Sequence, residues 1–440
     1  MDPRFVESPT PARALVRPDS VHRDAYISAE VFELEQRRFF AATWVFVAHA
    51  SQLREPGDFV TLEVAGQPLL VIRQVDGTIA VLHNRCAHKG TMLFTASAGN
   101  AGRNLRCPYH AWTYRLDGSA LAVPLKAGYE GTGMRESRAG AGLARVPHVK
   151  VYRDFVFVRL SDQGPSFSEY FGEALQWLDN MAERSPTGQL EVAGGVIRNV
   201  IRCNWKIYLE NINDTVHPVS THESAGNAAK GVWSAQAAQG PAPMAVEQLL
   251  PFASGYDFFD KMDAQVYPNG HSALGVSFST HSSYQVPPDY EAAMVNAYGE
   301  RAKDILGPAP QNSVLYPSLS VKSSPLAIRV IRPLAADRTL VEAWSFRAVG
   351  APDLLLQRAL TYNRLVFSPM SILAHDDIHL FESIQNGLRS NANEWVSLHR
   401  GYEPGELDVN AAIRCKGTSE LLMRNQFRAW DQRMCAGERA

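Results

Sequence analysis

The chain has 440 residues, of which 45% are hydrophobic and 20% charged, and its formal net charge is −2. This length predicts about two to four domains, with cores large enough to fold without disulfide bonds. The near-zero net charge gives no basic excess that would argue for a nucleic-acid or membrane-surface partner. The composition also excludes an intrinsically disordered or fibrous protein.

Apolar runs and cysteine usage predict the compartment. No apolar run approaches the ~20 residues that a membrane-spanning helix needs, and the first residues lack the apolar core of a signal peptide. The five cysteines, Cys86, Cys107, Cys203, Cys415 and Cys435, are sparse and odd in number, which argues against a disulfide framework. We therefore expect a soluble cytoplasmic protein.

Short strands with tight turns are expected between residues 57 and 160. The runs 58–64 and 68–73 are rich in strand-forming residues, and Asp-Gly pairs at 76–77 and 117–118 are typical of hairpin turns. This stretch predicts a small all-β domain.

The remainder of the chain mixes two periodicities. Helical spacing of apolar residues recurs at 167–184, 204–217, 353–367 and 419–434, and strand-like runs occupy 272–280, 326–334 and 339–349. The mixture predicts an α+β domain with a large antiparallel sheet flanked by helices. The Gly-, Ala- and Pro-rich stretch 224–244 is expected to form a flexible loop over a pocket.

Two short clusters in the all-β region each contain one cysteine and one histidine. Cys86 and His88 form C-x-H, and Cys107 and His110 form C-x2-H after 18 intervening residues. A tetrahedral zinc site is possible with these four side chains. The division of one thiolate and one imidazole per cluster instead favours a [2Fe–2S] centre with both cysteines on one iron and both histidines on the other.

The segment from about residue 43 to 150 resembles the Rieske family. Gly90, Pro108, Tyr109 and Trp112 also fit the two ligand loops of that family.

A second constellation lies at residues 204–222. Helical spacing would place Glu210, Asp214 and His217 on one helical face. The following Pro218 is expected to end that helix, with His222 returning from the next loop. Two imidazoles with a single carboxylate suit the facial triad of non-haem Fe(II) oxygenases. Taken alone, the pattern also fits a solvated helix face.

With both constellations, nearly the whole chain resembles the Rieske non-haem iron aromatic-ring-hydroxylating oxygenases, large (alpha) subunit. The motif E-N-x-x-D-x-x-H-x4-H is similar to the iron motif of that family. The resemblance implies that His217 and His222 are iron ligands and that Asn211 is the amide beside the iron. It places the third ligand in the acidic pair Asp376 and Asp377, and the family pattern favours Asp377.

The resemblance also implies a division into domains: an N-terminal helical segment (1–42) packing on the catalytic domain, a Rieske domain (43–155) and a catalytic iron domain (156–440). Val216 departs from the Tyr that is common in the family, and it and Phe367 are expected to line the substrate pocket.

Other side chains near these motifs have more general expectations. Arg329 and Arg332 are candidate partners for a carboxylated ring. His375 and His379 flank the acidic pair and are expected to be structural rather than ligands.

The sequence lacks a dinucleotide-binding G-x-G-x-x-G after a strand and a second ferredoxin-type cysteine set. A separate NAD(P)H-dependent reductase, with or without a ferredoxin, is therefore implied. The resemblance further implies a homotrimer, or an α3β3 assembly with a small beta subunit, in which the cluster of one subunit serves the iron of its neighbour. Asp214 is the residue expected at that junction, between an iron-ligand histidine and a cluster histidine.

We therefore expect a terminal oxygenase that uses O2 and reductase-supplied electrons to hydroxylate an aromatic compound, most simply by cis-dihydroxylation, with an aromatic carboxylic acid as the first candidate. A Rieske-type monooxygenase or oxidative demethylase is the alternative. A Rieske electron carrier without oxygenase activity would be much shorter and would leave the second constellation unused.

Overall fold

The structure, a computed structural model, describes residues 14–132, 142–235, 240, 242–407 and 411–436. The chain divides into two compact units, one of residues 40–167 and one of residues 1–39 with 168–440. Among the described residues, no helix is long and apolar enough to cross a membrane. The boundary expected at 155/156 falls inside the strand Phe155–Arg159, which belongs to the unit of residues 40–167.

The unit of residues 40–167 is built from short antiparallel strands, as predicted. They form three sheets, in the orders β6-β5-β4-β7, β10-β9-β8 and β11-β12-β3. The strands are β3 (Val45–His49), β4 (Asp58–Val64), β5 (Gln67–Arg73), β6 (Ile79–His83), β7 (Ala98–Asn100), β8 (Asn104–Arg106), β9 (Thr113–Arg115), β10 (Ala120–Ala122), β11 (His148–Tyr152) and β12 (Phe155–Arg159). Short 3-10 turns occur at Ala50–Gln52 and Lys126–Tyr129.

Both predicted hairpin turns are present in this unit. Gly77 and Gly118 have φ angles of +83° and +85°, which glycine adopts without steric cost. The preceding acids stabilise the turns, because Asp76 and Asp117 each accept a hydrogen bond from the backbone N–H two residues later.

The other unit contains one eight-stranded antiparallel sheet, in the order β13-β19-β18-β17-β16-β15-β14-β21. Its strands are β13 (Leu190–Ile201), β14 (Asp263–Val266), β15 (Ser272–Leu274), β16 (Asn312–Leu315), β17 (Leu319–Lys322), β18 (Ala327–Ala335), β19 (Arg338–Ala348) and β21 (Ile413–Lys416). A small sheet joins β1 (Val16–Arg17), β2 (Ser20–His22) and β20 (Trp395–Ser397).

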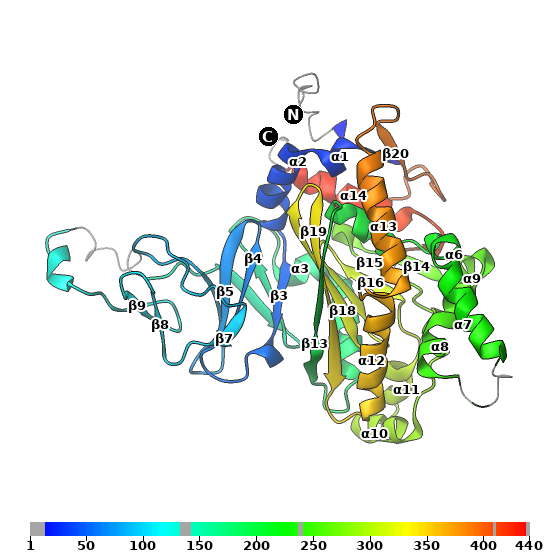
Figure 1. The fold of residues 1–440 in the computed structure, drawn as a ribbon, viewed down its shortest axis with the longest axis horizontal. Helices are drawn as coiled ribbons and strands as arrows, with labels where there is room; N and C mark the ends of the chain where they lie inside the picture. The colour runs from blue at the N-terminus through cyan, green and yellow to red at the C-terminus, as the bar shows by residue number, and fades with distance from the viewer. Residues whose placement is uncertain (1–13, 133–141, 236–239, 241, 408–410, 437–440) are drawn as a thin grey trace. The chain divides into compact units, whose positions relative to one another are not determined.

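Helices flank this large sheet, which confirms the predicted α+β class (Figure 1). Leu355, Ala359 and Tyr362 are buried at helical spacing on α12, which packs against β19. The helices are α1 (Asp24–Ile27), α2 (Ala29–Leu34), a π-helix (Glu35–Phe40), α3 (Phe167–Phe171), α4 (Gln176–Glu183), α5 (Trp205–Ile212), α6 (His217–Thr221), α7 (Glu223–Ala235), α8 (Met244–Leu249), α9 (Tyr256–Lys261), α10 (Pro288–Tyr298), α11 (Arg301–Leu306), α12 (Asp353–Val366), α13 (Ile372–Gly387) and α14 (Leu421–Met434). Short 3-10 turns lie at Gly172–Leu175, Leu250–Ala253 and Pro268–Gly270.

The expected flexible loop at 224–244 is wrong for most of its length, because α7 runs to Ala235 and α8 begins at Met244. Alanine has the highest helix propensity, and small side chains let α7 approach its neighbour closely. A Cβ at Gly226 would lie 2.5 Å from the backbone nitrogen of Ala253. Residues 236–239 and 241 of this stretch lie outside the described residues.

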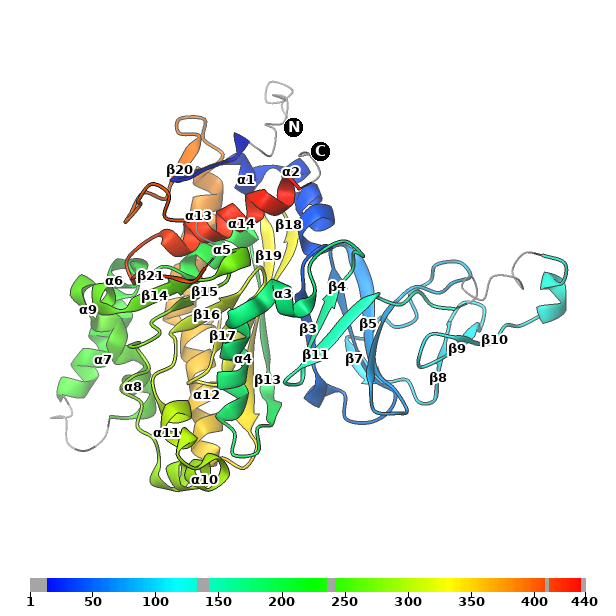
Figure 2. The ribbon, with the colours of Figure 1, turned by 180° about the vertical axis from the view of Figure 1, so that it is seen from behind.

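A buried ion pair joins the N-terminal segment to the centre of the catalytic unit. Glu35 is fully buried and lies 2.5 Å from the ammonium of Lys206 on α5. Its two oxygens also accept hydrogen bonds from the indole N–H groups of Trp205 and of Trp430 on α14. In Figure 2, α14 lies beside the N-terminal helices α1 and α2. One carboxylate thus connects three segments that are far apart in the sequence.

We expect Glu35→Leu to lower the free energy of unfolding by about 3–5 kcal/mol, because it leaves the Lys206 ammonium buried without a partner. Glu35→Leu combined with Lys206→Met should lose clearly less, since no buried charge then remains. Chemical denaturation followed by circular dichroism measures both. Lys416→Met, which removes an exposed ion pair with Asp260, should leave the transition unchanged. Equal losses for the single and double variants would contradict the role of the ion pair.

Candidate metal centres

The first candidate centre is formed by two similar loops in the unit of residues 40–167. Cys86 and His88 lie in the loop after β6, and Cys107 and His110 lie in the loop between β8 and β9. The Cys86 loop closes on itself through hydrogen bonds from Cys86 N–H to Thr91 and from Gly90 N–H to Cys86. The other loop closes through Cys107 N–H to Trp112 and Ala111 N–H to Cys107.

The sulfur and nitrogen sides of this centre have different exposure. Cys86 and Cys107 are both buried, and the Tyr114 hydroxyl lies 3.1 Å from the Cys86 sulfur. Burial alone would raise the pKa of Cys107, but hydrogen bonds from the backbone of Tyr109 and His110 and from Cys86 hold that pKa below its usual value. These hydrogen bonds therefore stabilise the thiolate form of Cys107 against the cost of burial.

The two imidazoles lie together on the outer side. The ring centres of His88 and His110 are 4.7 Å apart, and His88 stacks on Trp112 at 4.9 Å. His110 is exposed, whereas Nδ1 of His88 is buried with no hydrogen-bond partner among the described residues. An unpartnered buried nitrogen costs free energy unless a ligand engages it. Two buried thiols beside two imidazoles, one with such a nitrogen, fit a [2Fe–2S] cluster.

The second candidate centre corrects the helix expected at 204–217. Helix α5 ends at Ile212, and α6 begins at His217 rather than ending there, so Asp214 lies between the two helices. The physical reason is that proline is compatible with the first turn of a helix, where its missing N–H has no partner. Pro218 occupies such a position in α6, and His222 follows the end of this helix.

Two histidines and a carboxylate converge at this point. His217, His222 and Asp377 each offer one ligand atom, and these atoms all lie within 4.8 Å of one another. Asp377 Oδ1 is 3.8 Å from His217 Nε2 and 3.4 Å from His222 Nε2. Asp376 instead lies 3.9 Å from His222 Nδ1, on the opposite side of that ring. His217 begins α6, His222 follows the C-terminal end of α6, and Asp377 lies on α13. The fold thus brings the predicted triad together.

Asn211 lies directly beside this group. Its amide nitrogen is 3.0 Å from His217 Nε2 and donates to Asp377 Oδ1 at 3.2 Å. An amide N–H pointing at Nε2 requires the unprotonated nitrogen there, which places the proton on Nδ1. Nδ1 of His217 in turn lies 3.3 Å from Asp214 Oδ2. The hydrogen bonds therefore select the tautomer that a metal ion bound at Nε2 needs, and the residues fit a mononuclear iron.

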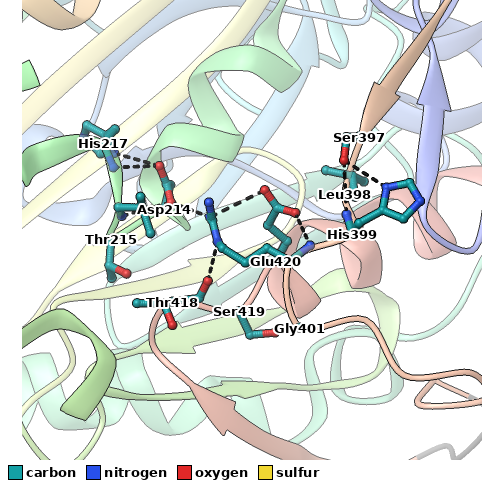
Figure 3. Close-up of polar contacts among 12 residues, drawn as sticks. Asp214, Thr215, His217, Ser397, Leu398, His399, Gly401, Thr418, Ser419 and Glu420 are labelled. Atoms are coloured by element: carbon teal, nitrogen blue, oxygen red, sulfur yellow. Dashed lines mark hydrogen bonds and ion pairs between the residues drawn. The ribbon is translucent and has the colours of Figure 1, made fainter. Parts of the chain in front are cut away.

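Asp214 is the centre of a polar network that sequence reasoning only partly identified. Its carboxylate accepts hydrogen bonds from the backbone N–H groups of Val216 and His217 and from the ring nitrogen Nδ1 of His217 (Figure 3). The guanidinium of Arg400 donates to Asp214 at 3.0 Å and lies 3.5 Å from Glu420. Burial alone would raise the pKa of Asp214, but hydrogen bonds from His217 and Val216 and the charge of Arg400 hold it below its usual value.

A cavity borders the candidate iron ligands. His217, His222 and Asp377 line it together with Phe252, Lys322, Arg329, Tyr362 and Phe367. The expectation that Phe367 lines a pocket thus agrees with the structure.

Three other expectations near this cavity have different outcomes. Val216 is not among its lining residues, because it lies in the turn that leads into α6. Arg332 is not available for a carboxylated ring, since it is paired with the buried Glu342 at 2.9 Å. His375 and His379 are both exposed and lie outside the group of converging ligand atoms.

Lys322 and Arg400 are two residues that the sequence analysis missed. Ser318, Ser320 and Lys322 alternate with Leu319 and Val321, which is a signal for one polar strand face. The structure buries that face. Arg400 has no local signal, because its partner Asp214 lies 186 residues away.

Glu210, on α5, supports a prediction about stability. Its side chain is buried, and one oxygen has no hydrogen-bond partner among the described residues. Burial raises the pKa of Glu210 to about 8, and Tyr26 and Lys206 only partly oppose this shift. In the unfolded chain the pKa is near 4.5. The folded state therefore binds more protons than the unfolded state between these values, and stability is lost as pH rises from 4.5 to 8.

We expect Glu210→Gln, which resembles the neutral acid, to raise the melting temperature at pH 8 and to change it little at pH 5. Inside this window, each unit of pH changes the free energy of unfolding of the parent protein by about 1.4 kcal/mol. Melting curves of the variant and the parent protein at both values measure the difference, with the exposed Glu403→Gln as control. An equal gain in melting temperature at pH 5 and at pH 8 would show that Glu210 is ionised at both values and would contradict the raised pKa.

Comparison with known proteins agrees with this geometry. Residues 43–147 match the Rieske [2Fe-2S] domain, and residues 180–437 match the ring hydroxylating alpha subunit (catalytic domain). The chain is 30% identical to the anthranilate 1,2-dioxygenase large subunit of Acinetobacter baylyi over 87% of this chain and 80% of that protein. It is also 30% identical to the N,N-dimethyl phenylurea N-demethylase subunit alpha of Sphingobium, over 89% and 84%.

The fold is similar to that of solved structures at lower identity. Naphthalene 1,2-dioxygenase with indole bound in the active site is 23% identical, with a TM-score of 0.78 over 97% of this chain and 95% of that one. The catalytic match alone covers more than half of the chain. The chain therefore belongs to the family of ring-hydroxylating oxygenase alpha subunits, which join a Rieske [2Fe–2S] domain to a catalytic domain that binds mononuclear non-haem iron.

Proposed function

We propose that this protein is the terminal oxygenase component that hydroxylates an aromatic ring with O2, most simply as a cis-dihydroxylation. The observation that carries the proposal is the convergence of His217, His222 and Asp377 on the wall of an aromatic-lined cavity. Three protein ligands from one side leave coordination positions open for O2 and substrate. In this proposal Cys86, His88, Cys107 and His110 hold the [2Fe–2S] cluster.

When bound, the cluster supplies single electrons and the mononuclear iron supplies the site where O2 reacts. The side chains of this chain prepare that site. Asp214 holds the His217 ring and its tautomer through the hydrogen bond at Nδ1, and the Asn211 amide lies beside Nε2, the nitrogen that would bind the iron. Phe252 and Phe367 give the cavity apolar walls that favour an aromatic ring and exclude water.

The reaction requires partners that deliver electrons. Converting a ring C=C bond and O2 into a cis-dihydrodiol consumes two electrons and two protons, and the chain lacks a dinucleotide-binding motif. The family works with separate reductase or ferredoxin components. For this protein we propose an NAD(P)H-dependent reductase, with or without a ferredoxin. We further propose a homotrimer or an α3β3 assembly, in which Asp214 connects the iron site to His110 of a neighbouring subunit.

The first substrate class to test is an aromatic carboxylic acid. The 30% identical relative is an anthranilate dioxygenase, and anthranilate carries a carboxylate on its ring. A second candidate function is oxidative N-demethylation, which is favoured by the equally similar N-demethylase alpha subunit. An electron carrier without oxygenase activity does not account for the catalytic-domain match at residues 180–437.

The two candidate reactions leave different products. The purified oxygenase, loaded with iron and cluster and supplied with a ferredoxin, a reductase and NADH, is incubated with a panel of aromatic acids and N-methylated anilines. Dihydroxylation gives a cis-diol with two oxygen atoms from O2, whereas demethylation gives formaldehyde. We expect diols from the acids. Formaldehyde without any diol would overturn the dihydroxylation proposal in favour of the demethylase.

A further inference from the structure

Two cationic side chains lie next to each other on the sheet that forms one wall of the cavity. Lys322 ends β17, and Arg329 is on β18. The register pairs Lys322 with Ala327 and Ser320 with Arg329. Directly paired residues share a face of the sheet, and so do residues two apart. Lys322 and Arg329 therefore project from the same face, and both line the cavity that contains the iron ligands.

Neither of these cations has an anionic partner. Lys322 is 3% exposed and Arg329 is 5% exposed. Lys322 donates to the backbone oxygen of Gln311, and Arg329 donates to the side-chain oxygens of Asn312 and Ser320, all of which are neutral. Among the residues that the structure describes, no ion pair reaches either side chain, and Nε of Arg329 is buried without a hydrogen-bond partner.

The carboxylates of the same cavity are committed elsewhere. Of the described residues that line it, Asp214 and Asp377 are the acids. Asp214 is bonded to Arg400 and His217, and Asp377 belongs to the triad. Burial lowers the pKa of Lys322, and the neighbouring charge of Arg329 lowers it further. The charged form of Lys322 is therefore unfavourable until an anion enters the cavity.

Arg332, three residues further along β18, shows the contrast. It is paired with Glu342, which is also bonded to Arg198. The same sheet thus neutralises a partly buried arginine where the residue has a structural role. Lys322 and Arg329 are left without such a partner, although they repel each other. Uncompensated buried charge is retained at functional sites rather than in cores that serve stability alone.

Aromatic rings flank both cations. The guanidinium of Arg329 lies 4.5 Å from the ring centre of Phe367, and the ammonium of Lys322 lies 5.2 Å from that of Tyr362. Both rings also line the cavity. A planar ligand placed between them would have an apolar environment for its ring and positive charge at one end.

We propose that Lys322 and Arg329 form an anion subsite that binds the carboxylate of an aromatic substrate and turns the ring toward His217, His222 and Asp377. This inference rests on the proposed function of the cavity as the substrate site. The fork of the guanidinium can hold both oxygens of a carboxylate. The ammonium adds a second charge, so neutral aromatic compounds bind less well than acids of the same shape.

The test compares acids with their neutral amides, which have nearly the same shape. Binding of benzoate against benzamide, and of 2-naphthoate against 2-naphthamide, is measured by calorimetry on the iron-loaded, cluster-loaded protein. We expect at least one acid to bind about 10-fold or more tightly than its amide, which corresponds to ~1.4 kcal/mol. Lys322→Met and Arg329→Met should each abolish most of this preference and leave amide binding within about twofold. The inference is overturned if no acid is preferred, or if the preference persists in both variants.

A matched control removes a cation from the same sheet but outside the cavity. Arg347, on β19, forms an exposed ion pair with Asp353, so Arg347→Met should keep the full preference for the acid. Stability provides a second readout. If Lys322 serves binding and not the fold, Lys322→Met should keep or raise the melting temperature, because it removes an unpaired buried charge. A large drop in melting temperature would assign Lys322 a structural role instead and contradict the inference.

Binding and turnover also separate this inference from the proposed function. An acid preference that depends on Lys322 and Arg329, without conversion of any aromatic acid, would retain the subsite and overturn the oxygenase proposal. Dihydroxylation of neutral aromatic compounds, with no preference for acids in binding, would retain the oxygenase proposal and overturn the anion subsite.

Discussion

His217→Ala, His222→Ala and Asp377→Ala should each abolish mononuclear iron binding and product formation while the visible spectrum of the [2Fe–2S] cluster stays unchanged. Loss of residues that merely orient metal ligands weakens metal binding by about 10–100-fold. Loss of a direct ligand should therefore exceed ~100-fold. The three side chains are the ones whose ligand atoms converge within 4.8 Å. Iron analysis after desalting, together with the cluster absorbance, measures the effect.

Cys107→Ser is the matched opposite of these variants. It should remove the cluster spectrum and leave mononuclear iron bound, because the two sets of ligands come from separate compact units.

Asp376→Ala tests the choice within the acidic pair. Asp376 lies on the Nδ1 side of His222, so this variant should retain more iron than Asp377→Ala. The opposite order, or cluster loss in the triad variants, would contradict the assignment of ligands.

At an iron concentration that offsets the ~10–100-fold weaker binding expected when a metal ligand loses its orienting partner, Asp214→Ala should keep both metal centres occupied and the cluster reducible, yet lower product formation by about 100-fold or more. The carboxylate fixes the proton of His217 on Nδ1 and anchors the turn into α6. Four donors, from Val216, His217 and Arg400, fill the acceptor positions of this carboxylate. Arg400 is the exposed donor among them, so we propose that an imidazole from a neighbouring subunit would take its place.

Two variants separate this proposal from a general effect of charge. Asp214→Asn keeps an oxygen for the backbone N–H groups but loses the charge, and we expect it to keep the fold and remain slow in product formation. Glu420→Gln changes the acid on the other side of Arg400 and should retain most activity. Rapid-mixing measurements of cluster oxidation in the presence of substrate and O2 detect the electron step directly. Near-normal product formation by Asp214→Ala with full metal occupancy would refute the proposal.

The all-β unit and the sulfur-containing loops were predictable because their determinants are local. Asp76–Gly77 and Asp117–Gly118 specify turns within a few residues. The pairs Cys86–His88 and Cys107–His110 each lie within one loop. Their spacing therefore carried the information that the structure displays. The helices α12 and α14 were predictable for the same reason, since their apolar spacing spans whole turns.

The predictions that were wrong depend on contacts that spacing does not encode. Pro218 starts α6 because Asp214 accepts the backbone N–H groups at its entry. The stretch that contains α7 becomes helical because small residues such as Gly226 fit tightly against the chain near Ala253.

The choice of Asp377 came from a family resemblance rather than from spacing. Lys322 and Arg400 acquire their significance from residues that are distant in the sequence.

A single-turnover experiment with 18O2 tests the central claim most directly. The protein is loaded with Fe(II) and its cluster is chemically reduced, so that the iron and the cluster each supply one of the two electrons that the reaction consumes. Without a reductase, it is then mixed with an aromatic acid that it binds and with 18O2. The account predicts one cis-diol per active site at most, with both hydroxyl oxygens labelled and with oxidation of the cluster in step with product. Oxidation of the cluster without hydroxylated product, or a product whose oxygen comes from water, would contradict it.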